Sequence, residues 1–264
     1  MTSIPSPAAH RPAGPATPAG RPVLVAVAHG SRDPRALPVV RALLARVREL
    51  RPGLDVRLGH VELNEPLLTD TLAGIRGPAV LVPLLLGRGY HVKHDLPAAL
   101  AGAPRVHGVV AGALGPHPLL ARALHTRLLE AGWPAGNRAP GHALVLAAAG
   151  SRDPESAADT SRTAALLSAR LGGVPVLPAY ASAAAPTVPQ ALAELAARGL
   201  SRIAVASCFT APGRFAAQSA QAAPWIVAAP LGAQDAMAEL VLHRYDRAAA
   251  GFPPSRHLLA AGRG

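Results

Sequence analysis

The five-residue segment Gly-Ser-Arg-Asp-Pro occurs twice in this 264-residue chain, starting at Gly30 and again, 120 residues later, at Gly150. In both places it follows a short apolar run and precedes a stretch with helical spacing. A turn repeated in the same setting indicates an internal duplication, in which both halves are built from the same supersecondary units. The residue in front of the turn differs, because His29 in the first half is replaced by Ala149 in the second.

Apolar runs and helical patterns alternate through both halves. Continuous apolar runs are typical of strands that are buried on both faces of a parallel sheet. Strands are predicted at 23–28, 55–63, 79–86 and 105–110, and then at 143–149, 174–182, 202–209 and 224–230. Helices are predicted at 35–50, from about 66, at 91–100 and 118–131, and then at 155–171, 186–199 and 233–249. We therefore expect an α/β protein with two similar flavodoxin-like domains, each a parallel sheet flanked by helices, facing each other across a cleft.

The duplication also sets the expected domain limits. Residues 22–138 form the first domain and 139–250 the second, between tails at 1–21 and 251–264. The first tail is rich in proline and lacks the apolar core of a signal peptide, so we expect it to be disordered. At the start of the first helix, Asp33 is expected to be the N-cap, with Pro34 at the first helical position.

The cysteine content and the apolar stretches bear on location. Cys208 is the single cysteine, so no intramolecular disulfide can form, which fits a reducing compartment. The longest apolar stretches, such as 79–86, are too short to span a bilayer. We expect a cytoplasmic protein that has no membrane partner.

The chain is strongly basic, with a formal net charge of +11. Nucleic-acid binding is disfavoured, because the basic residues are spread along the chain and only 3% of residues are aromatic. The charge either attracts a small anionic substrate or reflects a drift of composition toward arginine, since Lys93 is the single lysine.

Three potential metal ligands at predicted strand ends of the first half have no counterpart in the second. His29, Glu62 and His91 stand opposite Ala149, Ser182 and Arg214, while the turns and proline positions persist. Two imidazoles and a carboxylate can bind a divalent metal such as Fe, Co, Ni or Zn and leave coordination positions open. The alternative, that His29 only stabilises its turn, is less favoured because all three ligands are lost together.

Several common nucleotide and hydrolase motifs are absent from the sequence. Lys93 follows Val92 rather than glycine, so there is no P-loop, and 87–92 lacks the third glycine of a dinucleotide fingerprint. No G-x-S-x-G elbow is present. Ala28, in front of His29, disfavours a phosphohistidine enzyme, where a basic residue is usual.

Three segments together resemble the CbiX-type sirohydrochlorin chelatases of the class II chelatase superfamily. They are VLVAVAHGSRDP (23–34), HVELNEP (60–66) and VPLLLGRGYHVKHDLP (82–97). The second half resembles the degenerate repeat of the long, two-domain members, so the resemblance covers roughly residues 22–247. It implies chelatase-like domains and the insertion of Fe²⁺ or Co²⁺ into sirohydrochlorin, an octacarboxylate tetrapyrrole, without ATP.

The resemblance also implies roles for individual residues. His29 and His91 are implied to bind the metal and to accept protons from the pyrrole nitrogens, with Glu62 assisting at the metal. The metal is a substrate, and no cofactor is permanently bound. Arginine pairs well with carboxylates, so cations near the predicted mouth are expected to hold the substrate. The predicted substrate-binding residues are Ser31, Arg32, Arg88, Lys93, Arg152 and Arg214.

The sequence leaves some alternatives open. The two-domain chain is expected to be a monomer if the duplication reproduces a dimer of half-length chains. A carrier of metal or tetrapyrrole without turnover would use the same residues, and a phosphate-handling α/β enzyme is a further alternative. The choice between Fe²⁺ and Co²⁺ is also open, because imidazole and carboxylate ligands bind both metals. The lack of a His-rich tract slightly favours iron, and hence siroheme rather than cobalamin synthesis.

Overall fold

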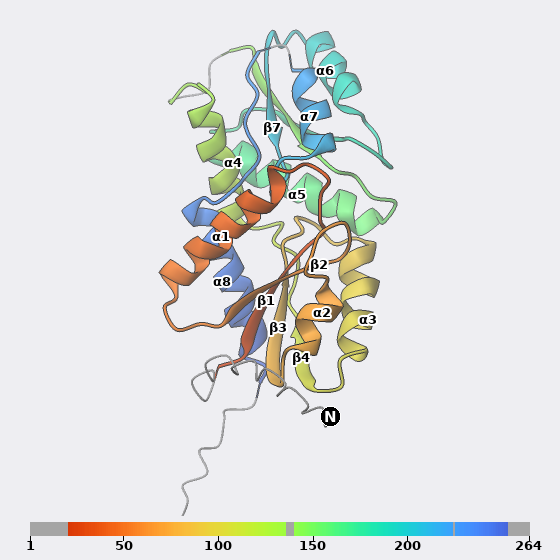
Figure 1. Cartoon of the computed structure of the whole chain (residues 1–264). Helices are drawn as coiled ribbons and strands as arrows, with labels where there is room; N and C mark the ends of the chain where they lie inside the picture. Colours follow the sequence, from red (N-terminus) through yellow and green to blue (C-terminus); the bar gives the residue numbers. More distant parts are fainter. Residues whose placement is uncertain (1–20, 136–139, 224, 253–264) are drawn as a thin grey trace, which may run out of the picture.

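Two parallel sheets, one from each half of the chain, form the framework of the protein (Figure 1). The structure is a computed structural model that describes residues 21–135, 140–223 and 225–252. The predicted tails, at 1–21 and 251–264, lie outside these residues except for Arg21, Gly251 and Phe252. The α/β architecture with two similar domains is confirmed.

The first sheet has the strand order β2-β1-β3-β4. Its strands are β1 (Val23–Ala28), β2 (Val56–His60), β3 (Gly77–Pro83) and β4 (Val106–Val110), all parallel. β1 is buried along its whole length, as its unbroken apolar sequence predicts. Ala28 pairs with His60, and Val27 pairs with Pro83. The segments that follow β1, β2 and β3 therefore leave the sheet at the same edge.

The second sheet has the order β6-β5-β7, with β5 (His142–Ala148), β6 (Val176–Tyr180) and β7 (Arg202–Ser207). The strand predicted at 224–230 is wrong within the described residues. Val227 makes only an isolated bridge with Val205. Beyond Val227 the chain packs against the loop after β7, where the Leu231 N–H donates a hydrogen bond to the Phe209 carbonyl. This departure ends the pairing with β7 after one bridge.

Helices cover both sheets, mostly where the helical periodicity predicts them. The first half has α1 (Ala36–Leu50), α2 (Leu68–Ala73), a π-helical turn η1 (His91–Asp95), α3 (Leu96–Ala101) and α4 (Pro118–Glu130). The second half has α5 (Pro154–Arg170), α6 (Val188–Ala197), α7 (Arg214–Gln221) and α8 (Asp235–Ala249). The sequence analysis did not predict α7. It is short, and Ala216 and Ser219 are its buried residues.

The two copies of the repeated turn start their helices differently. Asp153 is the N-cap of α5, where its carboxylate accepts the Glu155 N–H at 2.9 Å. The expectation that Asp33 caps the first helix is wrong, because α1 begins only at Ala36. Asp33 instead binds the backbone and guanidinium of Arg35, and these hydrogen bonds lower the pKa of Asp33 to about 2. Glu155 replaces Arg35 in the repeat, so that competing local ion pair is lost.

The last helix of each half packs against the other half. α8 lies beside α1, α4 and the first sheet, whereas α4 packs against α5 and β7 (Figure 1). Ion pairs of Arg46 with Asp235 and of Arg51 with Asp246 join α1 to α8, at 2.7 and 2.9 Å. The limits 22–138 and 139–250 stay a prediction, and in space each half contributes one helix to the packing of the other. Across the described ranges, no helix combines the length and apolar character needed to cross a membrane.

Candidate metal and substrate site

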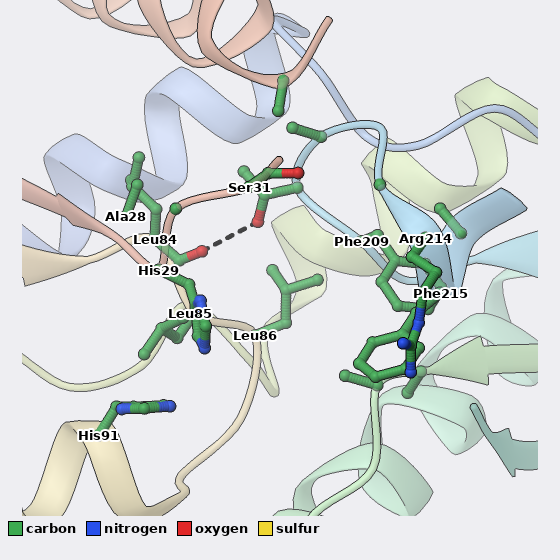
Figure 2. Close-up of a pocket in the computed structure, with 18 of the residues that line it drawn as sticks. Ala28, His29, Ser31, Leu84, Leu85, Leu86, His91, Phe209, Arg214 and Phe215 are labelled. Carbon is green, nitrogen blue, oxygen red and sulfur yellow. Dashed lines mark hydrogen bonds between the residues drawn. The ribbon is translucent and has the colours of Figure 1, made fainter. Parts of the chain in front are cut away.

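A cavity of about 780 Å³ lies where the carboxyl ends of the two sheets meet. Its first wall consists of the turn after β1, the segment after β2 and the 84–91 loop. Its second wall consists of the turn after β5 and the 208–215 loop. Figure 2 shows the two histidines on one side of the cavity and Arg214 with Phe215 on the other. Apolar side chains, including Leu85, Leu86 and Phe209, line the space between them.

In each half, the glycine of the repeated turn lets that turn lie directly against the segment that follows the second strand of the half. Gly30 has a φ of +105°, and a Cβ there would lie 1.9 Å from the Glu62 carbonyl oxygen. Gly150 has a φ of +90° and the same relation to Ser182, at 1.8 Å. Glycine alone combines this backbone conformation with so close an approach. The need for this contact explains why the turn recurs although the residue before it changes.

The structure brings the three predicted metal ligands together. The rings of His29 and His91 lie edge to face, with centroids 4.7 Å apart. Glu62 Oε1 lies 3.6 Å from His29 Nδ1. Within 21–135, 140–223 and 225–252, however, no three His, Cys, Asp or Glu side chains already form a group that could hold a metal ion. The ligand roles of these residues therefore stay a prediction.

Asp95 is a residue of this site that the sequence analysis did not single out. Its Oδ2 lies 2.6 Å from His91 Nδ1, one helical turn away. A carboxylate at this position holds the imidazole proton on Nδ1, which leaves Nε2 free to accept a proton or bind a metal. The signal in the sequence was the spacing of four residues between His91 and Asp95 at the start of a helix.

Two other potential ligands near the cavity are unsuited to the chemistry. His60 is 2% exposed, and its Nδ1 lies 3.1 Å from the Pro66 carbonyl oxygen. Burial lowers the pKa of His60, so its ring is a weak proton acceptor. Burial raises the pKa of Cys208 to about 12, so its thiol stays protonated and is a poor metal ligand.

Three of the predicted substrate-binding arginines are exposed around the cavity. Arg32 and Arg214 line it, and Arg152 lines the adjoining hollow. Arg32 and Arg152 occupy the same position of the repeated turn, one on each wall. The Arg214 guanidinium lies over the Phe215 ring at 5.0 Å. Among the described residues none of the three arginines forms an ion pair within 4.0 Å, so their charges face solvent.

Ser31, also predicted to bind substrate, serves the turn itself. Its Oγ accepts the Asp33 N–H at 3.1 Å, and its own N–H donates to Asn64 Oδ1 at 2.7 Å. Its hydroxyl proton is still available to a ligand in the cavity that it lines.

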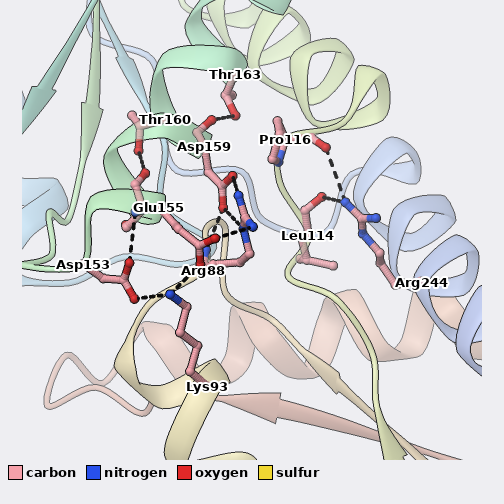
Figure 3. Close-up of polar contacts among 11 residues, drawn as sticks. Arg88, Lys93, Leu114, Pro116, Asp153, Glu155, Asp159, Thr160, Thr163 and Arg244 are labelled. Atoms are coloured by element: carbon pink, nitrogen blue, oxygen red, sulfur yellow. Dashed lines mark hydrogen bonds and ion pairs between the residues drawn. The ribbon is translucent and has the colours of Figure 1, made fainter.

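The remaining two predicted cations, Arg88 and Lys93, are bound to acidic residues of the second half. Arg88 donates to Asp159 and Glu155, and Lys93 lies between Asp153 and Glu155 (Figure 3). Their charges are thus already matched within the protein.

Comparison with known proteins identifies the family. The family model CbiX matches residues 23–131 and 143–248. The chain belongs to the CbiX family. The match in two segments mirrors the duplication, and it confirms the resemblance inferred from the motifs.

Two curated relatives of this CbiX-family chain are named for the same substrate, sirohydrochlorin. The sirohydrochlorin cobaltochelatase of Methanosarcina acetivorans is 32% identical over 82 residues, which are 30% of this chain and 63% of that protein. The sirohydrochlorin ferrochelatase of Bacillus subtilis is 28% identical over 177 residues, or 64% of this chain and 66% of that protein. The chain thus spans about two thirds of the length of these two relatives.

A solved structure supports the fold of this family member. SirB from Bacillus subtilis, determined with Fe³⁺, superimposes with a TM-score of 0.71 at 21% identity. The superposition covers 87% of this chain and 96% of SirB. At this level of identity the similarity establishes the two-domain architecture.

Proposed function

We propose that this protein is an ATP-independent chelatase that inserts Fe²⁺ or Co²⁺ into sirohydrochlorin. The observation that supports the proposal is the meeting of His29, His91 and Glu62 at one wall of a cavity between two sheets. Membership of the CbiX family gives this arrangement a substrate, because the curated relatives are named for sirohydrochlorin.

In this proposal the same residues bind the metal first and accept protons afterwards. Two imidazoles and a carboxylate bind the metal substrate loosely and leave positions open to the pyrrole nitrogens. Metal enters the ring as two N–H bonds break, so two protons must leave for each metal inserted. Once the metal has passed to the ring, His29 and His91 would each accept one of the two protons, His91 at Nε2, where Asp95 would stabilise the resulting imidazolium through Nδ1. The protons then pass to solvent at the open mouth.

The second wall, together with Arg32 of the first wall, binds the macrocycle. The apolar lining contacts the ring faces, and Arg32, Arg152 and Arg214 pair with carboxylates at the ring edge. These contacts exist in the ground state and the transition state alike, so they lower KM more than they raise kcat. Arg214→Ala is therefore expected to raise KM for sirohydrochlorin with a smaller effect on kcat.

The direct test follows the visible spectrum of sirohydrochlorin with Fe²⁺ or Co²⁺ in the presence of the protein. His29→Ala and His91→Ala are each expected to lose most of the activity while circular dichroism shows a folded protein. Ala149→His is not expected to rescue His29→Ala, because the second half has Ser182 where the first has Glu62. Near-normal turnover in both histidine variants would contradict the proposal.

The same assay separates the alternatives. A carrier would give at most one metallated ring per protein, whereas a chelatase gives many. A phosphate-handling enzyme would be favoured if phosphate esters, but not tetrapyrroles, raised the melting temperature. Rescue of a siroheme-deficient strain against rescue of a cobalamin-deficient strain identifies the metal used in the cell.

The oligomeric state follows from the same arrangement. One chain supplies both walls of the cavity, so we infer that the active form is a monomer. Light scattering of the active fraction tests this.

A further inference from the structure

The loop that carries His91 is attached to the second half by both of its cations. Arg88 donates from Nε and Nη2 to the two oxygens of Asp159, at 3.0 and 2.8 Å, and from Nη1 to Glu155 at 3.0 Å. Lys93 Nζ lies 2.6 Å from Asp153 Oδ2 and 2.5 Å from Glu155 Oε2. Figure 3 shows the whole cluster between the loop and the start of α5. The attachment points fall three residues before His91 and two residues after it.

Asp159 is the fixed point of this cluster. Its side chain is 1% exposed, and it also accepts the backbone N–H of Arg88 at 2.9 Å. Burial by itself would raise the pKa of Asp159, but the hydrogen bonds and charge of Arg88 outweigh it and keep the pKa below its usual range. A bidentate pair with an added backbone contact fixes the orientation of the loop as well as its distance.

The loop also approaches the second wall through its glycines. A Cβ at Gly87 would lie 3.6 Å from both Asp159 Cβ and Ser156 Oγ, and a Cβ at Gly89 would lie 3.6 Å from Ser151 Oγ. The Leu84 carbonyl accepts a hydrogen bond from Thr210 Oγ1 at 2.9 Å. The segment between β3 and His91 is therefore held by the second half along its length.

The repeat shows that this arrangement is specific to one wall. Moving back 120 residues from Glu155 and Asp159 leads to Arg35 and Val39 on the first half. There, Asp33 is neutralised locally by Arg35. In the part of the chain that the structure describes, Glu155 and Asp159, which replace these residues, form ion pairs only with Arg88 and Lys93 of the His91 loop. The half that lost the metal ligands has thus acquired the groups that hold a ligand of the other half.

We propose that Asp153, Glu155 and Asp159 are positioning residues for metal insertion, which act through Arg88 and Lys93 to hold His91 against His29. The proposal rests on the proposed function, in which His91 binds metal and accepts a proton. It assigns Arg88 and Lys93 to the geometry of the site instead of to the substrate carboxylates.

The test uses Lys93→Gln, which removes the charge and shortens the side chain by one atom, with Lys93→Arg as the conservative variant. Arg51→Gln is the matched control, because it breaks an ion pair between the two halves that lies between α1 and α8. Lys93→Gln is expected to lower kcat roughly 10-fold, as is typical when a partner that orients a ligand is removed. KM for sirohydrochlorin should stay within about twofold, because no contact with substrate is lost. Lys93→Arg and Arg51→Gln should keep the wild-type kcat.

A second readout does not depend on activity. In the wild-type protein without substrate, a nuclear Overhauser effect should connect the ring protons of His29 and His91, and Lys93→Gln should weaken it. Asp159→Asn should also weaken this Overhauser effect if the variant folds. If it does not fold, Lys93→Gln alone tests the positioning role. A raised KM with unchanged kcat in Lys93→Gln would assign Lys93 to substrate binding and overturn the proposal. An unchanged Overhauser effect would overturn it as well. If the wild-type protein fails to insert metal, the proposed function fails, and the Overhauser effect still decides the positioning role.

Discussion

Replacing Gly30 by alanine tests the proposal that the first wall carries the chemistry and the second wall binds the substrate. The new Cβ would lie 1.9 Å from the Glu62 carbonyl oxygen, whereas ordinary contact begins at 3.4 Å, so that carbonyl must retreat by about 1.5 Å. Backbone strain at a φ of +105° costs about 1–3 kcal/mol, and overpacking adds about 1–3 kcal/mol. The sum is about 4 kcal/mol, which corresponds to a fall of roughly 12 °C in Tm for a chain of this size.

Gly150→Ala is the matched variant in the second half. Its Cβ would lie 1.8 Å from the Ser182 carbonyl oxygen, so the loss of stability should be similar. The effects on activity should differ, because Gly30→Ala displaces Glu62 and the neighbouring His29. A displacement of about 1 Å can cost roughly 100-fold in rate, so Gly30→Ala should lower kcat by about that factor. Gly150→Ala should act mainly on KM.

The assay is metal insertion under saturating sirohydrochlorin, well below the Tm of both variants as measured by calorimetry. Equal losses of kcat in Gly30→Ala and Gly150→Ala would refute the assignment of the chemistry to the first half. An unchanged Tm in both variants would refute the steric reasoning.

Three further predictions concern single groups. Asp95→Asn should lower kcat roughly 10-fold or more, because an amide no longer stabilises protonated His91, and steady-state kinetics with circular dichroism as a fold control checks this. Burial keeps the pKa of His60 in the folded protein below its ordinary 6.5. Between these two pKa values the unfolded state binds a proton that the folded state does not, so the free energy of unfolding falls as the pH drops through this range. Urea titrations between about pH 7.5 and 5.5 should show that the free energy of unfolding depends less on pH in His60→Gln than in the wild type. Part of the dependence should remain, because His117 and His125, whose pKa values are also lowered, act in the same direction. Arg88→Ala leaves the Asp159 carboxylate buried without its main partner and should cost about 3–5 kcal/mol in urea unfolding, part of which Asp159→Ala in the same chain should restore.

The regular part of the fold could be predicted from the sequence because it depends on local patterns. Unbroken apolar runs at 23–28 and 143–149 coincide within a residue with β1 and β5, the central strands of their sheets. The candidate ligands could be found because duplication supplies an internal comparison. A turn that is retained marks the framework, and His29, which Ala149 replaces, marks a position of candidate chemistry.

The remainder depends on contacts between residues far apart in the chain. Helical periodicity shows that one face of α8 is buried, but it does not show that this face covers the first sheet rather than the second. A basic residue near the mouth has no visible partner in the sequence, so Arg88 and Lys93 were predicted to bind substrate. Their partners follow 60 or more residues later, at the start of α5. Asp95 escaped notice because its role depends on the rotamer of His91, which spacing alone does not define.

The exchange of helices and the cluster at α5 together explain why the second half is needed although it lacks the proposed metal ligands. One macrocycle has one central cavity, so a second set of ligands would have no use. In the proposed reaction, however, a single wall would not enclose the ring, and it would not hold the His91 loop, since the carboxylates that bind Arg88 and Lys93 belong to the other half. The first sheet also depends on α8 for its cover, and the Tyr245 hydroxyl of that helix donates to the Pro22 carbonyl at the entrance to β1. The second half can therefore lack the proposed ligands and still be retained, because each half completes the core of the other and the second half completes the site proposed on the first.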